Sequence, residues 1–196
     1  MKKFFIILFL LPLLVGCSEE DTLLSERDKI EKYLTSSRGM IAEEALGSVI
    51  EEEPAFYSTF GRYAYRHIVN YYDADRELKP TLDWGDRAEI RFNAYVFSGN
   101  EPTITSGLYL SNVQEVIDEA GKKSGNTLAW SNEPLVVELG TTKLLRGVEM
   151  VLAGCHEADS VQVYMTSGLA YGTGEFGIVP KNSMVAWYMK IEKVTK

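Results

Sequence analysis

Alternating apolar and polar positions in the second half of the chain predict an antiparallel β-sheet with one buried face. The clearest case is 87–97, where apolar residues alternate with charged or amide residues. Because successive side chains of a strand point to opposite faces, the buried face consists of Ala88, Ile90, Phe92, Ala94 and Val96. Alternation, or enrichment in β-branched and aromatic residues, predicts further strands over 61–72, 135–139, 160–166 and 184–194.

Two helical segments are predicted before the first strand. Ser25 and Asp28 have the spacing of a capping box, so a helix is expected to begin there, and Gly39 offers a stop. The apolar face of this helix consists of Ile30, Tyr33 and Leu34. A second helical or mixed stretch covers 41–52. We expect both to pack on the main body of the protein rather than to form a functional site.

A third, short helix is predicted over 143–152. Thr141 or Thr142 offers its cap, and its apolar side consists of Leu144, Leu145, Val148 and Leu152. The stretch 98–132 is irregular apart from a helix-like segment at 113–120. One short helix among several antiparallel strands predicts an α+β fold, in which a twisted antiparallel sheet wraps around that helix.

The N-terminus has the pattern of an export signal. It is basic over its first three residues and apolar from 4 to 15, which is shorter than the roughly 20 residues that cross a bilayer. The segment ends Leu14-Val15-Gly16-Cys17, which resembles the lipobox of bacterial lipoproteins. That resemblance implies cleavage before Cys17 and lipidation of its thiol. An ordinary secretory signal, with Cys17 incidental, is the alternative.

These patterns divide the chain into four parts. We expect a signal peptide over 1–16, an acidic tether over 17–24, a helical extension over 25–59 and a main domain over 60–196. The lipid on Cys17 would hold the protein to a bilayer in the cell envelope, which we expect to be the outer membrane. The protein would lie on either the periplasmic face or the cell-surface face of that membrane. The acidic run at 18–21 is either a surface-export signal or a plain solvated linker.

Composition argues against several kinds of partner. The chain has 20 Lys and Arg against 28 Asp and Glu, and loss of the two signal lysines leaves a net charge of −10, which argues against nucleic-acid binding. After lipidation the remaining cysteine, Cys155, can form no internal disulfide, and we expect a structural thiol. The two histidines, His67 and His156, offer little for a metal site, so no metal or cofactor is predicted.

Four segments of the C-terminal half occur in a distinctive order: Leu144-Leu145-Arg146-Gly147-Val148-Glu149, Gly168-Leu169-Ala170-Tyr171-Gly172, Gly177-Ile178-Val179-Pro180-Lys181-Asn182 and Val185-Ala186-Trp187. Their order and spacing resemble the FKBP-type peptidyl-prolyl cis-trans isomerases. The resemblance covers about 60–195 and is weakest over 98–134. It implies an FKBP-like fold and cofactor-free isomerisation of proline-containing or unfolded polypeptide segments.

The resemblance also implies a site. Tyr171 would donate its hydroxyl to the carbonyl near the proline, and Leu145 would present its backbone N–H to a substrate carbonyl. Val148 would form the pocket floor, and the walls would be Phe92, Leu135, Leu144, Phe176, Ile178, Val179 and Trp187. Plain core packing is the alternative for Leu144, Ile178 and Val179.

The chain departs from the family pattern at several of these positions. Val148 replaces the usual Trp floor, and Leu110 stands where the family has a carboxylate. Lys181 replaces a second Pro, and the loop after the tyrosine is one residue short. We therefore carry two hypotheses: a membrane-anchored isomerase that assists folding of exported proteins, or a catalytically degenerate FKBP-like binding or chaperone module. The clients and the oligomeric state stay open.

Overall fold

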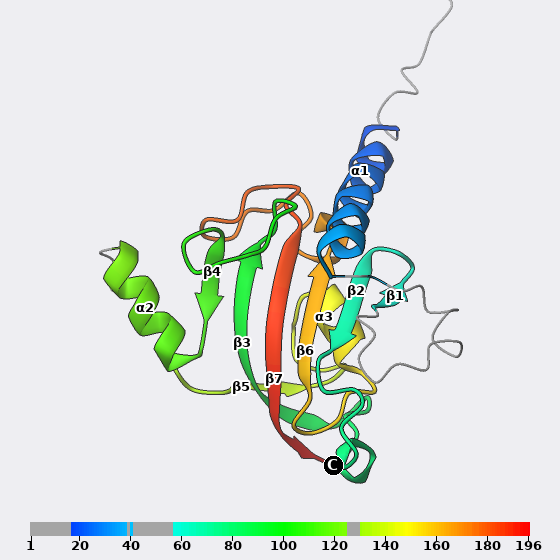
Figure 1. Ribbon diagram of the computed structural model, residues 1–196, viewed down its shortest axis with the longest axis vertical. Coiled ribbons are helices and arrows are strands. Elements are labelled where there is room, and N and C mark those ends of the chain that lie inside the picture. Colours follow the sequence, from blue (N-terminus) through cyan, green and yellow to red (C-terminus); the bar gives the residue numbers. More distant parts are fainter. Residues whose placement is uncertain (1–16, 39, 41–56, 125–129) are drawn as a thin grey trace, which may run out of the picture.

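The computed structural model describes residues 17–38, 40, 57–124 and 130–196. Within them the chain is α+β, with an open antiparallel sheet of seven strands and three α-helices, which confirms the predicted α+β class and antiparallel sheet (Figure 1). The strand order is β1-β2-β6-β7-β3-β4, and β5 also pairs with β3. The elements are α1 (Cys17–Tyr33), a π-helical turn η1 (Leu34–Arg38), β1 (Ser58–Phe60), β2 (Ala64–Ile68), a 3-10 turn η3 (Arg76–Leu78), β3 (Arg87–Val96), β4 (Leu108–Ser111), α2 (Gln114–Ser124), β5 (Leu135–Glu138), α3 (Arg146–Leu152), β6 (Ser160–Met165), a 3-10 turn η4 (Ser167–Leu169) and β7 (Val185–Thr195).

The two longest strands, β3 and β7, form the centre of the sheet. They pair along their whole length, and the register shifts between Glu89 and Ile90. The other edge of β3 is shared, because β5 pairs with its first half and β4 with its second half. A further shift lies between Ala94 and Tyr95. Such irregularities bend a strand and increase its twist, so the sheet curves around α3.

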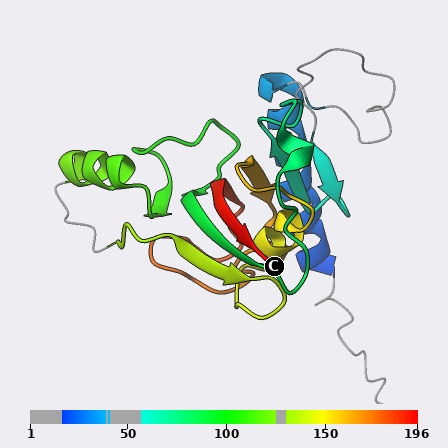
Figure 2. The same ribbon diagram turned by 90° about the horizontal axis from the view of Figure 1, so that it is seen from below.

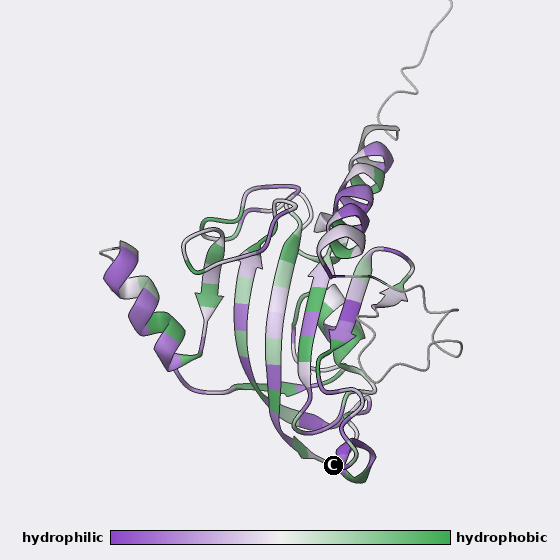
Figure 3. Cartoon of the chain, viewed as in Figure 1, coloured by the Kyte–Doolittle hydropathy of each residue, from purple (hydrophilic) through white to green (hydrophobic). Residues whose placement is uncertain are grey.

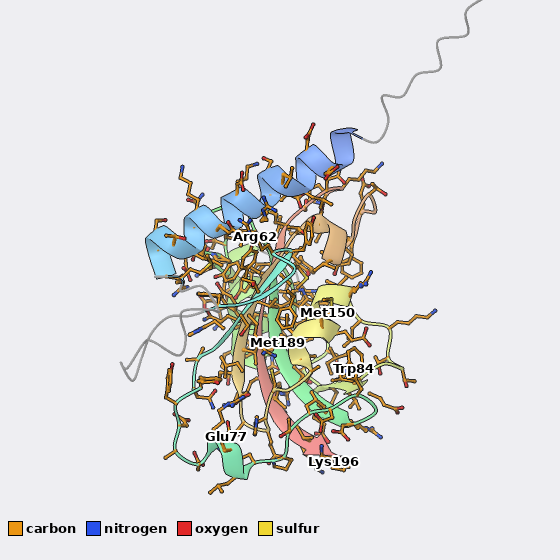
Figure 4. The ribbon with its side chains drawn as sticks, turned by 90° about the vertical axis from the view of Figure 1, so that its right-hand side faces the viewer. Arg62, Glu77, Trp84, Met150, Met189 and Lys196 are labelled. Carbon is orange, nitrogen blue, oxygen red and sulfur yellow. The ribbon has the colours of Figure 1, made fainter. Side chains whose placement is uncertain are left out.

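The inner face of the sheet and α3 enclose the main core. The predicted alternation of β3 is confirmed, since Ala88, Ile90, Phe92 and Ala94 are all at most 5% exposed. Figure 4 shows α3, which carries Met150, beside the central strands of the sheet, among them β7 with Met189. A Cβ added at Gly147 would lie 2.7 Å from the sulfur of Met165, so this helix approaches β6 more closely than a side chain would allow.

The outer face of the sheet is covered at one end by α1. Ile30, Tyr33 and Leu34, the predicted apolar face of this helix, are buried and form a second core with aromatic side chains of the sheet. Tyr164 is central there: its ring contacts Tyr33, and its hydroxyl is 2.6 Å from that of Tyr188. The solvent side of α1 is mainly hydrophilic (Figure 3). The predicted packing of this helix on the main body is therefore confirmed.

The helix α2 lies at the opposite edge of the sheet (Figure 1). It confirms the helix predicted over 113–120, and Val116 and Ala120 pack with Tyr95 and Leu108 in a small third core. The preceding strand β4 was not predicted. It is four residues long and follows a stretch with Pro102 and turns, so its pattern is too short to distinguish from a loop.

Three predicted boundaries differ from the structure. The tether expected over 17–24 is the first half of α1, and Ser25 lies inside that helix rather than at its cap. Acidic residues in a first helical turn complement the helix dipole, which explains why a polar run is helical here. The strand expected over 61–72 is the shorter β2, because Gly61 and Arg62 both have φ of 60° and form a turn before it.

The helix expected over 143–152 begins only at Arg146, since Leu145 has an extended backbone with φ −60° and ψ 134°. The predictions for the signal peptide at 1–16, the stop at Gly39 and the helix at 41–52 fall outside the described residues, as does the side chain of Cys17. In the part of the chain that is described, no helix has the length and apolar character needed to cross a bilayer.

Candidate functional site

Five aromatic side chains lie together, and we call them the aromatic cluster: Phe92, Tyr109, Tyr171, Phe176 and Trp187. Phe92 and Trp187 are stacked, with centroids 4.5 Å apart and planes 8° apart. Tyr171 and Phe176 form a second stack at 4.9 Å and 6°. Tyr109 lies between the stacks and meets Tyr171 and Phe176 edge-on.

The sheet register places the first stack. Ala94 pairs with Trp187 and Phe92 with Met189, so Phe92 and Trp187 are diagonal neighbours on the inner face. Diagonal neighbours on one face are within reach of each other when they carry aromatic rings. Asn112 fixes the backbone at this point, because its Oδ1 accepts the Phe92 N–H at 2.6 Å. Asn112 is 5% exposed, and sequence reasoning gave it no role.

Hydrogen bonds connect the two stacks through Tyr109. The indole Nε1–H of Trp187 donates to the Tyr109 hydroxyl at 2.7 Å, and the Tyr171 hydroxyl donates to the same oxygen at 3.4 Å. Burial raises the pKa of both tyrosines above the usual 10.0, so both phenols are neutral donors at physiological pH. The cluster thus combines apolar walls with uncharged hydroxyl groups.

The loop that carries Tyr171 is closed by backbone hydrogen bonds. The carbonyl of Ser167, in η4, accepts the N–H of Ala170 at 3.0 Å and that of Gly172 at 2.8 Å. Further along, Phe176 and Val179 bind each other through both their N–H groups and carbonyls, around a tight turn at Gly177, where φ is 56°. Both members of the second stack are therefore fixed by their own loop.

The predicted pocket residues from α3 and from the segments before it belong to the main core or pack against it. Val148 is 1% exposed and belongs to the main core, and the core also includes Phe92, Val179 and Trp187. Partly buried apolar residues pack against that core, among them Leu135, Leu144, Leu145 and Tyr171. Leu145 accepts the Glu149 N–H at 3.0 Å, and no hydrogen bond to its own N–H is found among the described residues.

Eight of the ten predicted pocket residues belong to the main core or pack against it. Phe176 belongs to the aromatic cluster through its stacked ring, whereas Ile178 belongs to neither group. Ile178 is 67% exposed at the turn of its loop and is not part of the main core. Phe176 is 44% exposed although its ring is stacked. The predicted floor residue Val148 and the predicted wall residue Val179 are each 1% exposed, so they act here as core.

Sequence reasoning missed the central residue, Tyr109. Its position was visible as the aromatic residue just before Leu110, where the family has an aromatic residue and then a carboxylate. Its role depends on contacts with residues 62 and 78 positions away, which no local pattern reveals. Leu110 is partly buried against the main core. Its side chain is apolar, so this position has no carboxylate.

Other reactive groups lie away from the cluster. Cys155 is fully buried and donates to the Val151 carbonyl at 3.2 Å, and burial raises the pKa of its thiol to about 11. This is the environment of an inert structural thiol. Within the described ranges no group of three or more His, Cys, Asp or Glu could hold a metal ion.

Comparison with known proteins gives no assignment. No family model matches the chain, and no curated protein matches it either. The functional argument therefore depends on the sequence segments and on the geometry of the aromatic cluster.

Proposed function

We propose that this protein is a lipid-anchored peptidyl-prolyl cis-trans isomerase of the FKBP type, which acts on proline-containing or unfolded segments of exported proteins in the cell envelope. The observation that carries the proposal is the aromatic cluster. The family resemblance names four of its five members, all except Tyr109, as pocket residues. They come from β3, β7 and the loop after η4. Phe92 stacks on Trp187 and Tyr171 stacks on Phe176, and Tyr109 connects the two pairs.

The chemistry suits such a cluster. Rotation about a prolyl amide has a barrier of about 18–20 kcal/mol because the C–N bond has partial double-bond character. The twisted amide has lost that conjugation and is less polar at its carbonyl, so an apolar aromatic wall stabilises it more than the planar amide. Each 1.36 kcal/mol of such differential stabilisation is a factor of about ten in rate. The reaction needs no nucleophile, metal or cofactor.

The roles of individual residues follow from this. The Tyr171 hydroxyl makes only a long hydrogen bond to Tyr109, so it can turn to donate to the substrate carbonyl next to the proline. Leu145 would offer its backbone N–H, and Val148 would form the floor. Phe92, Phe176 and Trp187 would be aromatic walls around the proline ring. Cys17 would carry the lipid that holds the site at a membrane.

A binding or chaperone module is the second candidate. Leu110 and Val148 favour it, because the family's carboxylate and Trp floor are both replaced by apolar side chains packed into the main core. A protein of this kind would hold proline-containing or extended segments in the same cluster without accelerating rotation.

A protease-coupled assay on an Ala-Leu-Pro-Phe peptide separates the two candidates. The detergent-solubilised protein should accelerate isomerisation at micromolar concentration, and Y171F should lower the rate several-fold. If the folded protein gives no acceleration while the peptide still quenches its tryptophan fluorescence, the binding module is the better description. An unchanged rate in Y171F removes this hydroxyl from the mechanism.

A further inference from the structure

A buried glutamate of α1 contacts the turn that precedes Tyr171. Glu26 is 5% exposed, and its Oε2 accepts two hydrogen bonds from Ser167, from the N–H at 2.8 Å and from the hydroxyl at 3.0 Å. Ser167 is 3% exposed and is the first residue of η4. These two side chains lie 141 positions apart in the sequence, so the contact joins the N-terminal helix to the C-terminal half.

The same turn receives a second contact from α1. A Cβ added at Gly168 would lie 3.1 Å from Cδ2 of Leu23, so Leu23 packs directly on the backbone of η4. Leu23 and Glu26 are three residues apart and therefore share one face of the helix. That face continues through Ile30 into the second core. The helix thus holds η4 with one apolar and one polar side chain.

Ser167 in turn fixes both neighbours of Tyr171. Its carbonyl accepts the N–H of Ala170 and the N–H of Gly172, the two residues that flank Tyr171 in the chain. The peptide unit that donates to Glu26 and the carbonyl that holds the tyrosine therefore belong to one residue. A shift of Ser167 would move Tyr171 relative to Tyr109 and Phe176, which are fixed from β4 and from the loop turn.

The burial of the Glu26 side chain has a free-energy cost. Its other carboxylate oxygen, Oε1, is buried and has no hydrogen-bond partner among the described residues. A carboxylate that loses water without full compensation destabilises the folded state. An apolar residue would pack on this face of α1 at less cost, but it could not accept the Ser167 N–H.

We propose that Glu26 is a positioning residue of the isomerase site, which makes α1 part of that site rather than a separate extension. The inference rests on the proposed isomerase function. Glu26 acts through Ser167, and the quantity it controls is the placement of the Tyr171 hydroxyl. A Gln at this position keeps an oxygen acceptor for Ser167, whereas an Ala does not.

The test compares four variants of the full-length protein in detergent: E26A, E26Q, S167A and E31A. Glu31 is the matched control, because it also docks α1 on the body, through Arg62 at 2.6 Å and Tyr65 at 2.6 Å, while no hydrogen bond or ion pair joins it to η4 in the described part of the chain. Two quantities are measured for each variant: kcat/KM for the prolyl peptide and the 19F resonance of fluorotyrosine at Tyr171, assigned with Y171F. Thermal unfolding shows that each variant is folded.

E26A should lower kcat/KM about tenfold, since it removes two buried hydrogen bonds to a carboxylate, and it should shift the Tyr171 resonance. E26Q should keep at least about half of the activity, because it retains the acceptor. The kcat/KM of S167A should lie between those of E26A and E26Q, and S167A serves as the deciding variant if E26A does not fold. E31A should lower the unfolding temperature while leaving kcat/KM and the resonance as in the wild type.

Two results would overturn the proposal. The first is a wild-type kcat/KM together with an unshifted Tyr171 resonance in folded E26A, or in S167A where E26A does not fold. The second is a loss of kcat/KM in E31A equal to that in E26A, which would show that only the general docking of α1 matters. If the wild-type protein shows no isomerisation at all, the proposed function fails separately. The Tyr171 resonance then decides alone whether Glu26 positions this loop.

Discussion

The hydrogen bond between Trp187 and Tyr109 is the most sharply testable part of the aromatic cluster. The substitution Y109F removes the oxygen that accepts the indole N–H at 2.7 Å, and both side chains are nearly inaccessible, at 7% and 5% exposed. The Phe ring keeps the packing of Tyr109, so the main loss is a buried N–H left without a partner. Such a loss costs about 1–3 kcal/mol.

The expected magnitude follows from that contact. We predict that Y109F lowers the free energy of unfolding by about 2 kcal/mol, and a chain of this size loses about 2–4 °C of unfolding temperature for each kcal/mol. The matched control is Y171F, whose hydrogen bond to Tyr109 is 3.4 Å long and partly exposed, so it should cost less than about 1 kcal/mol. Urea unfolding, followed by circular dichroism, measures both variants.

A double-mutant cycle isolates the pair. In a W187F background the indole N–H is absent, so adding Y109F should cost about 1–2 kcal/mol less than it costs in the wild type. The reasoning is refuted if Y109F unfolds within roughly 0.5 kcal/mol of the wild type, or if the cost is equal in the two backgrounds. Either result would mean that the buried N–H is satisfied in another way.

Three further substitutions address the buried residue Val148, the buried ion pair and acid stability. V148W, which restores the family's floor residue, should destabilise the fold by about 1–3 kcal/mol in urea unfolding, since Val148 is 1% exposed and its surroundings are closed. R76A should cost about 3–5 kcal/mol, because it leaves the carboxylate of Asp159 buried with its bidentate partner gone, and R76A/D159N should recover part of that loss. Burial alone would raise the pKa of Glu31, but hydrogen bonds from Arg62 and Tyr65 hold that pKa below the usual 4.5. The contribution of Glu31 to folding stability is therefore present above pH 4.5 and is lost as the pH falls below it. E31Q should flatten this acid part of the curve of unfolding free energy against pH.

The strands were predictable because one face of each is buried and the other meets water. Four of the five predicted strands occur with boundaries within about two residues, which is the usual precision for such patterns. The fifth, over 61–72, is shorter because its ends turn away at Gly61 and after Ile68. A run of β-branched and aromatic residues predicts a strand, but it does not say where backbone hydrogen bonding stops.

The contacts that place the cluster were not predictable in the same way. The four cluster residues named from the resemblance form two stacked pairs. Tyr109 and Glu26 obtain their contacts from partners far away in the sequence. A glutamate in a polar helix looks like a solvated residue, and only the packing of α1 on η4 shows that it is buried. Sequence patterns report the period of an element but not which neighbour covers it.

The helical form of the segment after Cys17 changes what a lipid there would do. A flexible tether would let the site sample a wide volume, but α1 runs without interruption from Cys17 to the residues that hold η4 (Figure 1). Figure 2 shows this helix on the opposite side of the molecule from α2. At 1.5 Å per residue, Cys17 lies about 9 Å along the helix from Leu23 and about 14 Å from Glu26. With the lipid that we propose, the Tyr171 loop would therefore be held within a few nanometres of the bilayer surface. The same helix would then anchor the protein and position its site, which restricts the substrates to polypeptide segments close to the membrane.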